Sequence, residues 1–134
     1  MVSVVTDPIA DMLTRIRNAN QVRHANVTMP GSKMKEGVAR ILMQEGFIDS
    51  FDVKDDGPGT ALTISLKYGP KREQVIKGIK RISSPGRRVY SKASELPRAQ
   101  GGLGVVVVST SQGLLPDREA RRRKLGGELV CEVW

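Results

Sequence analysis

Residues 101–134 read GGLGVVVVSTSQGLLPDREARRRKLGGELVCEVW, and this stretch decides the fold. Its four consecutive valines, at 105–108, predict a central strand that is buried on both faces. A hydroxyl-rich loop at 109–113 follows, then a basic, helix-prone run at 117–124 and a final apolar strand at 128–134. A loop of this kind on a rigid scaffold is suited to placing short hydrogen-bonding side chains against an anionic ligand.

The composition indicates one ordinary domain or two small packed subdomains, because the chain has 134 residues of which 39% are hydrophobic. No apolar run approaches the ~20 residues that a membrane helix needs. The N-terminal stretch lacks the features of a secretory signal, and the single cysteine, Cys131, excludes an internal disulfide and fits a reducing compartment. We therefore expect a cytoplasmic protein without a membrane partner.

The net charge of +8 is unevenly distributed along the chain. Residues 1–70 are neutral overall, whereas residues 71–98 carry nine Lys or Arg against two Glu, and residues 99–134 add a net charge of +1. Localised excess at a pI of about 10.1 favours a surface for nucleic acid over a merely solvated face. An acidic lipid surface is disfavoured, since the basic segment is rich in turns and is not an amphipathic helix.

The first half of the chain predicts an α-β-α-β-β subdomain over residues 1–68. A polar cap and a proline at Thr6-Asp7-Pro8 indicate a helix start, and Ser32 can cap a second helix that ends at Gly46. Alternating apolar residues indicate two paired strands around an Asp- and Gly-rich turn. The expected elements are, in order, a helix to about residue 20, an extended segment at 27–29, the second helix at 32–46, and strands at 47–53 and 60–68.

The second half, residues 69–134, predicts a mainly β subdomain with a short helix. Residues 75–83 fit either a helix or an extended segment, but Ser84-Pro85-Gly86-Arg87 indicates a type II turn that leads into a strand at 88–90. A hairpin is therefore favoured over a long helix. The fold class that follows is α+β, with two small packed subdomains.

The sequence gives little support for a catalytic site or a metal site. The one histidine, His24, and Cys131 leave a distant nucleophile–base pair open, although a small apolar side chain in a strand explains Cys131 better. One Cys and one His cannot supply a structural zinc site, and no phosphate-binding glycine motif follows a strand. We expect no enzyme, no metal and no cofactor.

The residues that suit RNA recognition lie in the second half. Ser109, Thr110 and Ser111 are short donors and acceptors for 2′-hydroxyls and phosphates, although turn chemistry alone also explains them. Tyr90 lies within the basic segment and can either stack on a base or pack at a strand edge. Backbone groups near Gly126-Gly127 allow close approach of a phosphate or ribose, and a plain turn is the alternative.

Four blocks of this sequence, in order, resemble the bacterial small-subunit ribosomal protein S8 family. The blocks are TDPIADMLTRIRNA at 6–19; SKMK at 32–35 with IL at 41–42 and EGFI at 45–48; IKRIS at 79–83 with PGRRVY at 85–90; and GLG at 102–104 through STS at 109–111, DREAR at 117–121 and GGEL at 126–129. They span nearly the whole chain, so the resemblance is specific.

The resemblance implies a two-subdomain α+β protein of the ribosome that binds 16S rRNA directly and organises the central domain, or platform, during 30S assembly. It implies neighbouring small-subunit proteins, among them S5 and S12. In some bacteria it also implies repression of the protein's own operon, through a similar structure in the mRNA. The localisation that it implies is the small subunit of the cytoplasmic ribosome.

The resemblance carries a set of RNA-binding residues onto this chain: Ser109, Thr110, Ser111, Gln112, Tyr90, Gly126, Gly127, Glu128, Lys33, Pro85, Gly86, Arg87 and Arg88. Two positions depart from the family's pattern. Pro116 stands where Thr or Ser usually caps the last helix, and Ser84 stands where Lys is frequent.

Overall fold

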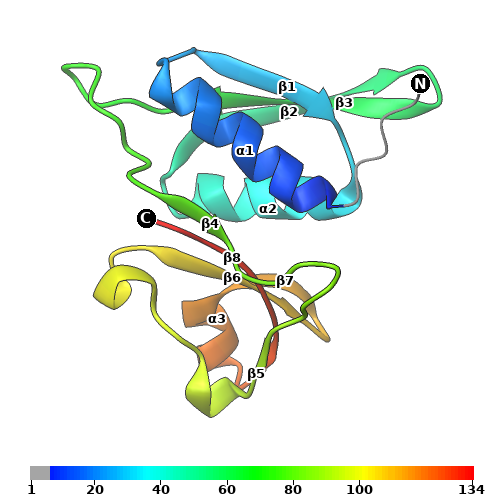
Figure 1. Cartoon of the computed structure of the whole chain (residues 1–134), viewed down its shortest axis with the longest axis vertical. Coiled ribbons are helices and arrows are strands. Elements are labelled where there is room, and N and C mark those ends of the chain that lie inside the picture. The colour runs from blue at the N-terminus through cyan, green and yellow to red at the C-terminus, as the bar shows by residue number, and fades with distance from the viewer. Residues whose placement is uncertain (1–6) are drawn as a thin grey trace.

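The computed structural model describes residues 7–134 (Figure 1). Its first helix, α1 (Pro8–Gln21), begins at the predicted Asp7-Pro8 pair. The Asp7 carboxylate accepts a hydrogen bond of 3.1 Å from the N–H of Ala10 and so caps the helix, while proline has no N–H to leave unpaired in the first turn. Thr6, which we also expected at this helix start, lies outside the described residues.

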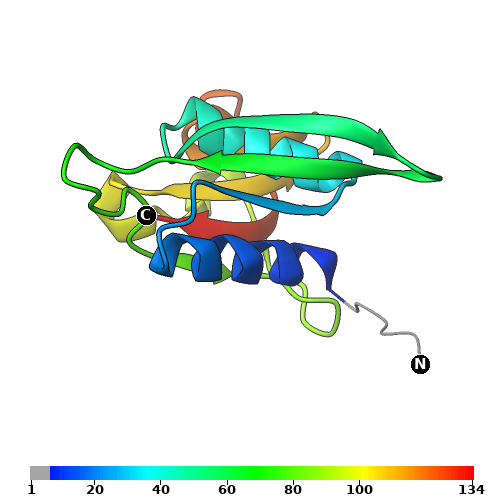
Figure 2. The same cartoon turned by 90° about the horizontal axis from the view of Figure 1, so that it is seen from above.

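The first half has the predicted order of two helices and three extended segments, and its three strands form one antiparallel sheet in which the first strand also pairs with the third. The sheet has the order β1-β3-β2, with β1 (Asn26–Pro30), β2 (Ile48–Asp56) and β3 (Gly59–Leu66). The second helix, α2 (Lys33–Gln44), is capped by the Ser32 hydroxyl, which accepts from the N–H of Lys35 at 3.2 Å. The ladder between β2 and β3 continues to the pair Asp56–Gly59, so the turn is shorter than we expected and the hairpin extends past the ends of both helices (Figure 2).

The second half is built on an antiparallel sheet with the strand order β4-β8-β6-β7, and β5 also pairs with β8. Its elements are β4 (Ile79–Arg81), β5 (Tyr90–Ser91), short 3-10 turns at Ala93–Glu95 and Ala99–Gly102, β6 (Val105–Thr110), β7 (Gly113–Pro116), α3 (Asp117–Arg122) and β8 (Gly127–Val133). Together the two sheets and three α-helices confirm the α+β class.

The predicted hairpin before β5 is wrong in its pairing. β4 and β5 both pair with β8, through Lys80–Glu132 and Tyr90–Glu128, and not with each other. They lie along one edge of β8, and the chain between them leaves the sheet. The reason is that β8 offers a backbone partner to both short strands. The turn itself is closed by two hydrogen bonds of 3.0 Å between Ser84 and Arg87 and by the Ser83 hydroxyl, which accepts from the N–H of Val89 at 2.9 Å.

The turn itself is not of type II. That type needs a left-handed φ near +80° at its third residue, and the φ of Gly86 lies outside the left-handed region. Proline at the second position is compatible with more than one turn type, so the Pro85-Gly86 pair alone does not specify a type II turn.

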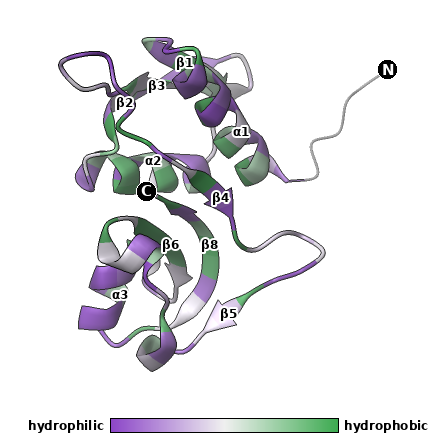
Figure 3. Cartoon of the chain, turned by 60° about the vertical axis from the view of Figure 1, so that its left-hand side comes forward, coloured by the Kyte–Doolittle hydropathy of each residue, from purple (hydrophilic) through white to green (hydrophobic). Residues whose placement is uncertain are grey.

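β6 is buried on both faces, as its valines predict. Val105 and Val107 belong to a hydrophobic cluster that also contains Ile16 of α1 and Leu42 of α2. Val106 and Val108 face a second cluster, which includes Leu96, Leu115, Ala120 and Leu129 beneath α3. Figure 3 shows β6 as a hydrophobic strand beside the hydrophilic α3. The first cluster therefore draws on both halves of the chain, while α1 and α2 lie between the two sheets (Figure 1).

Polar contacts also join the two halves. The Arg81 guanidinium donates to the Asp7 carboxylate, with Nε 3.1 Å from Oδ2, and both side chains are only 15% exposed. The Arg17 guanidinium donates to the carbonyl of Ile79 at 2.6 Å. On the other side of the molecule, Nε of Arg118 donates to the Glu45 carboxylate at 3.0 Å. The orientation of the halves is thus held by ion pairs as well as by the shared core.

The Asp7–Arg81 pair predicts a pH-dependent contribution to stability. Burial raises the pKa of the Asp7 carboxyl, but hydrogen bonds from Arg81 and from the N–H of Ala10 outweigh this and lower it overall. The contribution is therefore complete above the unfolded pKa of about 3.9 and is lost as the pH falls through the lower folded value. We expect Asp7→Asn to lose about 1–3 kcal/mol of unfolding free energy at pH 7 in urea denaturation, and progressively less below pH 4.

The matched control is Asp11→Asn, which breaks the exposed pair between Asp11 and Arg15 within α1. It should cost only about 0.3–0.5 kcal/mol. Equal losses in the two variants, or a loss at Asp7 that does not change with pH, would contradict a stabilising link between the halves.

Candidate nucleic-acid interface

The predicted hydroxyl loop is a strand end and a tight turn. Ser109 and Thr110 are the last residues of β6, and only Ser111 and Gln112 lie between it and β7. The existence of β7 is a correction, because we expected a loop to lead directly to the helix. Gly113 provides the reason, since its φ of 96° lets the chain reverse at once and pair again with β6.

The three hydroxyls have different roles. Thr110 Oγ1 donates to the carbonyl of Gly113 at 2.8 Å and accepts from the N–H of Gln112 at 3.0 Å, so it stabilises the turn. Within residues 7–134, the hydroxyls of Ser109 and Ser111 make no hydrogen bond to another group of the chain. Turn chemistry therefore accounts for Thr110, and the two serines keep their hydrogen-bonding capacity for a ligand.

The strand register aligns three of the predicted residues. Tyr90 on β5 lies opposite Glu128 on β8, and Glu128 lies opposite Ser109 on β6. We refer to these three residues as the cross-strand row. Tyr90 is 69% exposed, so its ring is not a packing residue. Arg88 donates to the Glu128 carboxylate at 3.0 Å, which ties the segment before β5 to the middle of the row.

Gly126 and Gly127 are explained by close strand packing. A Cβ on Gly127 would lie 2.0 Å from the carbonyl oxygen of Ser109, and one on Gly126 would lie 2.4 Å from that of Ser91. No side chain fits at either position unless the backbone shifts. The glycines therefore bring β5 and β6 close to the start of β8 and so form the row, which is a more specific role than a plain turn.

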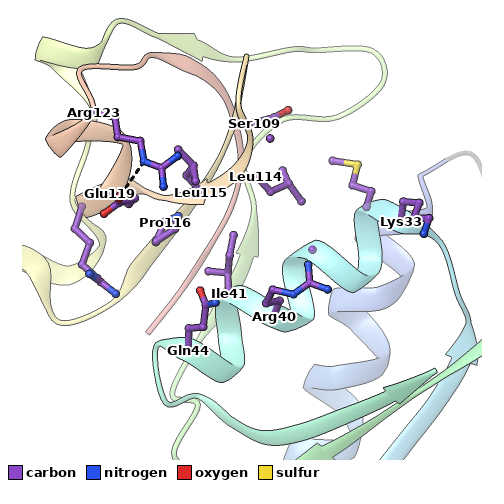
Figure 4. Close-up of a pocket in the computed structure, with 14 residues that line it drawn as sticks. Lys33, Arg40, Ile41, Gln44, Ser109, Leu114, Leu115, Pro116, Glu119 and Arg123 are labelled. Carbon is purple, nitrogen blue, oxygen red and sulfur yellow. Dashed lines mark hydrogen bonds and ion pairs between the residues drawn. The ribbon is translucent and has the colours of Figure 1, made fainter.

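Two other predicted RNA-binding segments, Lys33 and the turn at 84–88, border cavities near this row. Lys33 starts α2 and lines a cleft of about 640 Å³ together with Ser109. Figure 4 shows this cleft with Arg40 of α2 on one side and Leu114 of β7 on the other. Pro85 and Arg88 line a neighbouring cavity with Ser32, so the N-terminal end of α2 borders both. Gly86 and Arg87, between them, are exposed.

The basic run at 117–124 is partly neutralised by ion pairs within the chain. Arg121 pairs with Asp117, and both Arg122 and Arg123 pair with Glu119. Hydrogen bonds from Arg122 and Arg123 lower the pKa of the Glu119 carboxyl to about 2. Arg123 also donates to the Gln112 side chain at 3.0 Å and thus orients the turn of the hairpin. The helix positions the hairpin more than it attracts an anion.

Pro116 precedes α3 without supplying a side-chain cap, as its lack of a hydroxyl predicts. The carboxylate of Asp117 instead accepts a hydrogen bond of 3.0 Å from the N–H of Val106, and Asp117 is buried. The helix start is therefore held by a contact to β6 rather than by a local cap.

Cys131 and His24 do not form a nucleophile–base pair. Cys131 is fully buried on β8, and burial raises the pKa of its thiol to about 12. His24 is exposed in the connection between α1 and β1. A protonated thiol without access to the surface cannot act as a nucleophile. Among residues 7–134 no cluster of His, Cys, Asp or Glu could hold a metal ion, and no described helix is long and apolar enough to cross a membrane.

The chain is similar to known proteins over nearly its whole length. The model of a family described as "Ribosomal protein S8" matches residues 7–134. A protein of Caldanaerobacter subterraneus subsp. tengcongensis, named "Small ribosomal subunit protein uS8", is 60% identical over 131 residues, which are 98% of this chain and 99% of that protein. Proteins of the same name from Finegoldia magna and Clavibacter michiganensis subsp. michiganensis are each 56% identical, covering 98% and 97% of this chain and 100% and 98% of their own lengths.

The close approach at Gly127 predicts a large effect of a single methyl group. We expect Gly127→Ala to lose about 1–3 kcal/mol of unfolding free energy, because the new Cβ must displace the backbone of β6. Gly59→Ala is the control, since a Cβ there meets nothing within 4 Å and the φ of Gly59 is not left-handed. Denaturant midpoints of the two variants measure the difference, and a Gly127 variant as stable as the control would show that the strands can separate freely.

Proposed function

The chain belongs to the ribosomal protein S8 family, and we propose that it is a primary 16S rRNA-binding protein of the 30S subunit. Members of this family are structural constituents of the small ribosomal subunit and not enzymes, and the buried thiol of Cys131 agrees with the absence of catalysis. The finer part of the proposal is direct binding to the central domain of the RNA, which would organise the platform during assembly in the cytoplasm.

The cross-strand row is the observation that carries the proposal. On three adjacent strands it presents an exposed aromatic ring, a carboxylate held by Arg88 and a hydroxyl that has no hydrogen-bond partner in the part of the chain that the structure describes. Base-paired RNA exposes 2′-hydroxyls and base edges in a shallow minor groove, which a sheet surface with short polar groups can contact. Ser111 at the tip of the hairpin and Lys33 on α2 extend this surface toward the RNA backbone.

On this surface, the residues that attract RNA differ from those that recognise it. Arg87, Lys92 and Arg98 belong to the basic segment at 71–98 and make no ion pair within residues 7–134, so they remain available to phosphates. Phosphate contacts position a protein on a nucleic acid without reading its sequence. We infer that these cations hold the RNA while Ser109, Ser111 and Tyr90 recognise its shape.

Two further parts of the proposal follow from the same surface. An mRNA segment that folds like the rRNA site would compete for the row, which is the basis for repression of the protein's own operon. A reporter that carries the operon leader tests this second role. The protein neighbours that we propose in the subunit are S5 and S12, through surfaces that the RNA leaves uncovered.

We expect Ser109→Ala to weaken binding to a 16S rRNA central-domain fragment by about 1–3 kcal/mol, because the RNA group that it pairs with is left unsatisfied. Thr110→Ala should act mainly by loosening the turn. Ser50→Ala on β2 is the control, since Ser50 is exposed on the other sheet. Filter binding over a salt series measures these affinities, and an equal affinity for scrambled RNA would refute specific binding.

Variants of Tyr90 test whether its exposed ring stacks on a base of the RNA. Tyr90→Ala should cost about 1–3 kcal/mol of binding free energy if the ring stacks on a base, whereas Tyr90→Phe should bind nearly as well as the natural protein. Fluorescence titration with the same RNA fragment measures both. If the alanine variant binds unchanged, the ring does not contact the RNA; if the phenylalanine variant is equally impaired, the hydroxyl and not the ring is recognised.

A further inference from the structure

A small cavity of about 250 Å³ lies where α1, the segment before β4 and Trp134 meet. Arg17 and Asn20 of α1 line it on one side, and Gln74, Lys77 and Trp134 line it on the other. The indole ring of Trp134 packs directly on Gly78, because a Cβ there would lie 2.2 Å from the ring. The cavity is therefore bounded by a fixed aromatic ring, the three carboxamides of Asn20, Gln21 and Gln74, and two cations.

Asn20 carries a buried acceptor that nothing in the described chain satisfies. Its side chain donates to the carbonyl of Ile76 at 3.0 Å, and its backbone carbonyl accepts from the Gln74 side chain at 2.9 Å. The residue is only 6% exposed, yet within residues 7–134 Oδ1 has no hydrogen-bond partner. A buried acceptor left unpaired destabilises the folded chain, so a ligand that brings a donor to this atom is favoured.

The rim of the cavity is cationic. Arg17 of α1 and Lys77 of the segment before β4 line it, while Arg23 follows α1 and Lys71 and Arg72 follow β3 nearby in the chain. None of these five side chains pairs with a carboxylate among residues 7–134. Arg23 donates to the carbonyl of Arg72 at 2.9 Å, which brings the two parts of this rim together. The acidic side chain in this segment, that of Glu73, accepts from the N–H of Lys71 at 2.8 Å. A basic peptide is repelled here and an anionic ligand is attracted.

We propose that this cavity binds one unpaired nucleotide of RNA, whose base donates an amino hydrogen to Asn20 Oδ1 while its phosphate lies near Lys77 and Arg17. The volume is below the ~300–1,000 Å³ of sites for drug-sized ligands and suits a single planar ring system. Unpaired bases are commonly recognised by a polar contact to their edge and by an aromatic or Arg group. The proposal rests on RNA binding as the function but uses none of the residues of the cross-strand row.

The place of the cavity in the molecule limits how one RNA can contact both the cavity and the cross-strand row. The C terminus lies on the left of Figure 1, whereas the turn between β4 and β5 and the hairpin of β6 and β7 lie on the right. An RNA that reaches the cavity and the row must therefore pass along the molecule, or two separate RNA segments must contact it. Of the net charge of +7 on residues 71–98, +2 lies on residues 71–77, on the side of the cavity.

Free ribonucleoside monophosphates test the cavity without any rRNA. AMP, CMP and GMP have an exocyclic amino group on the base, and UMP does not. We expect AMP, CMP or GMP to shift the NMR signals of the Asn20 side-chain amide and the Trp134 indole N–H, with at least a several-fold weaker effect of UMP. Equal shifts with UMP would overturn recognition of the amino group, and no shift with any of the four would overturn the site.

Binding to intact 16S rRNA provides a second test of the cavity. Lys77→Gln changes an exposed side chain, and Lys67→Gln is the matched control on an exposed lysine outside the cavity lining. For binding to whole 16S rRNA, the plot of log affinity against log salt should become shallower by about 0.7 in the Lys77 variant and stay unchanged in the control. Ultraviolet crosslinking should attach a nucleotide to Trp134 or Lys77, and its absence would overturn the site even if RNA binds normally. Loss of rRNA binding with intact nucleotide shifts would instead refute the proposed function alone.

Discussion

Four consecutive valines of β6 face alternately into two hydrophobic clusters, and both halves of the molecule depend on this strand. Val105 and Val107 close the cluster under α1 and α2, while Val106 and Val108 anchor α3 and the 3-10 turns. Burial of a side chain of this size is worth about 1.5–3 kcal/mol, so the run contributes a large share of the stability of a small protein. Because β6 cannot move without disturbing both clusters, the serine at its end is held in a fixed place.

Sequence reasoning recovered the elements whose patterns are local. The Asp7-Pro8 pair and Ser32 marked helix starts through their own hydrogen bonds, and the valine run marked its strand through composition alone. It missed β7 and misassigned the partner of β5, because strand pairing is a long-range choice. Nothing near Tyr90 indicates that its partner is Glu128 rather than the segment just before the turn.

The charges of the proposed binding surface show the same limit of sequence-based prediction. Counting Lys and Arg located the excess at residues 71–98 but could not tell free cations from paired ones. The structure shows that Arg81 and Arg88 pair with Asp7 and Glu128, whereas Lys77 makes no ion pair with any of the described residues 7–134. Asn20 gave no signal at all, since an asparagine near a helix end is ordinary, and only the packing of residues 74–78 against α1 makes its side chain a buried acceptor.

β8 lies in the middle of the second sheet, although it follows every one of its partners in the chain. During synthesis, β4, β5 and β6 must therefore wait for residues 127–133 before they can be joined, which places the slowest, most non-local pairing at the end. Until then the valines of β6 are without one neighbour and are exposed to misassociation. A chain that stops before Gly127 also lacks the middle of the cross-strand row. Under the proposed function, a truncated copy would therefore lack part of the surface that binds RNA.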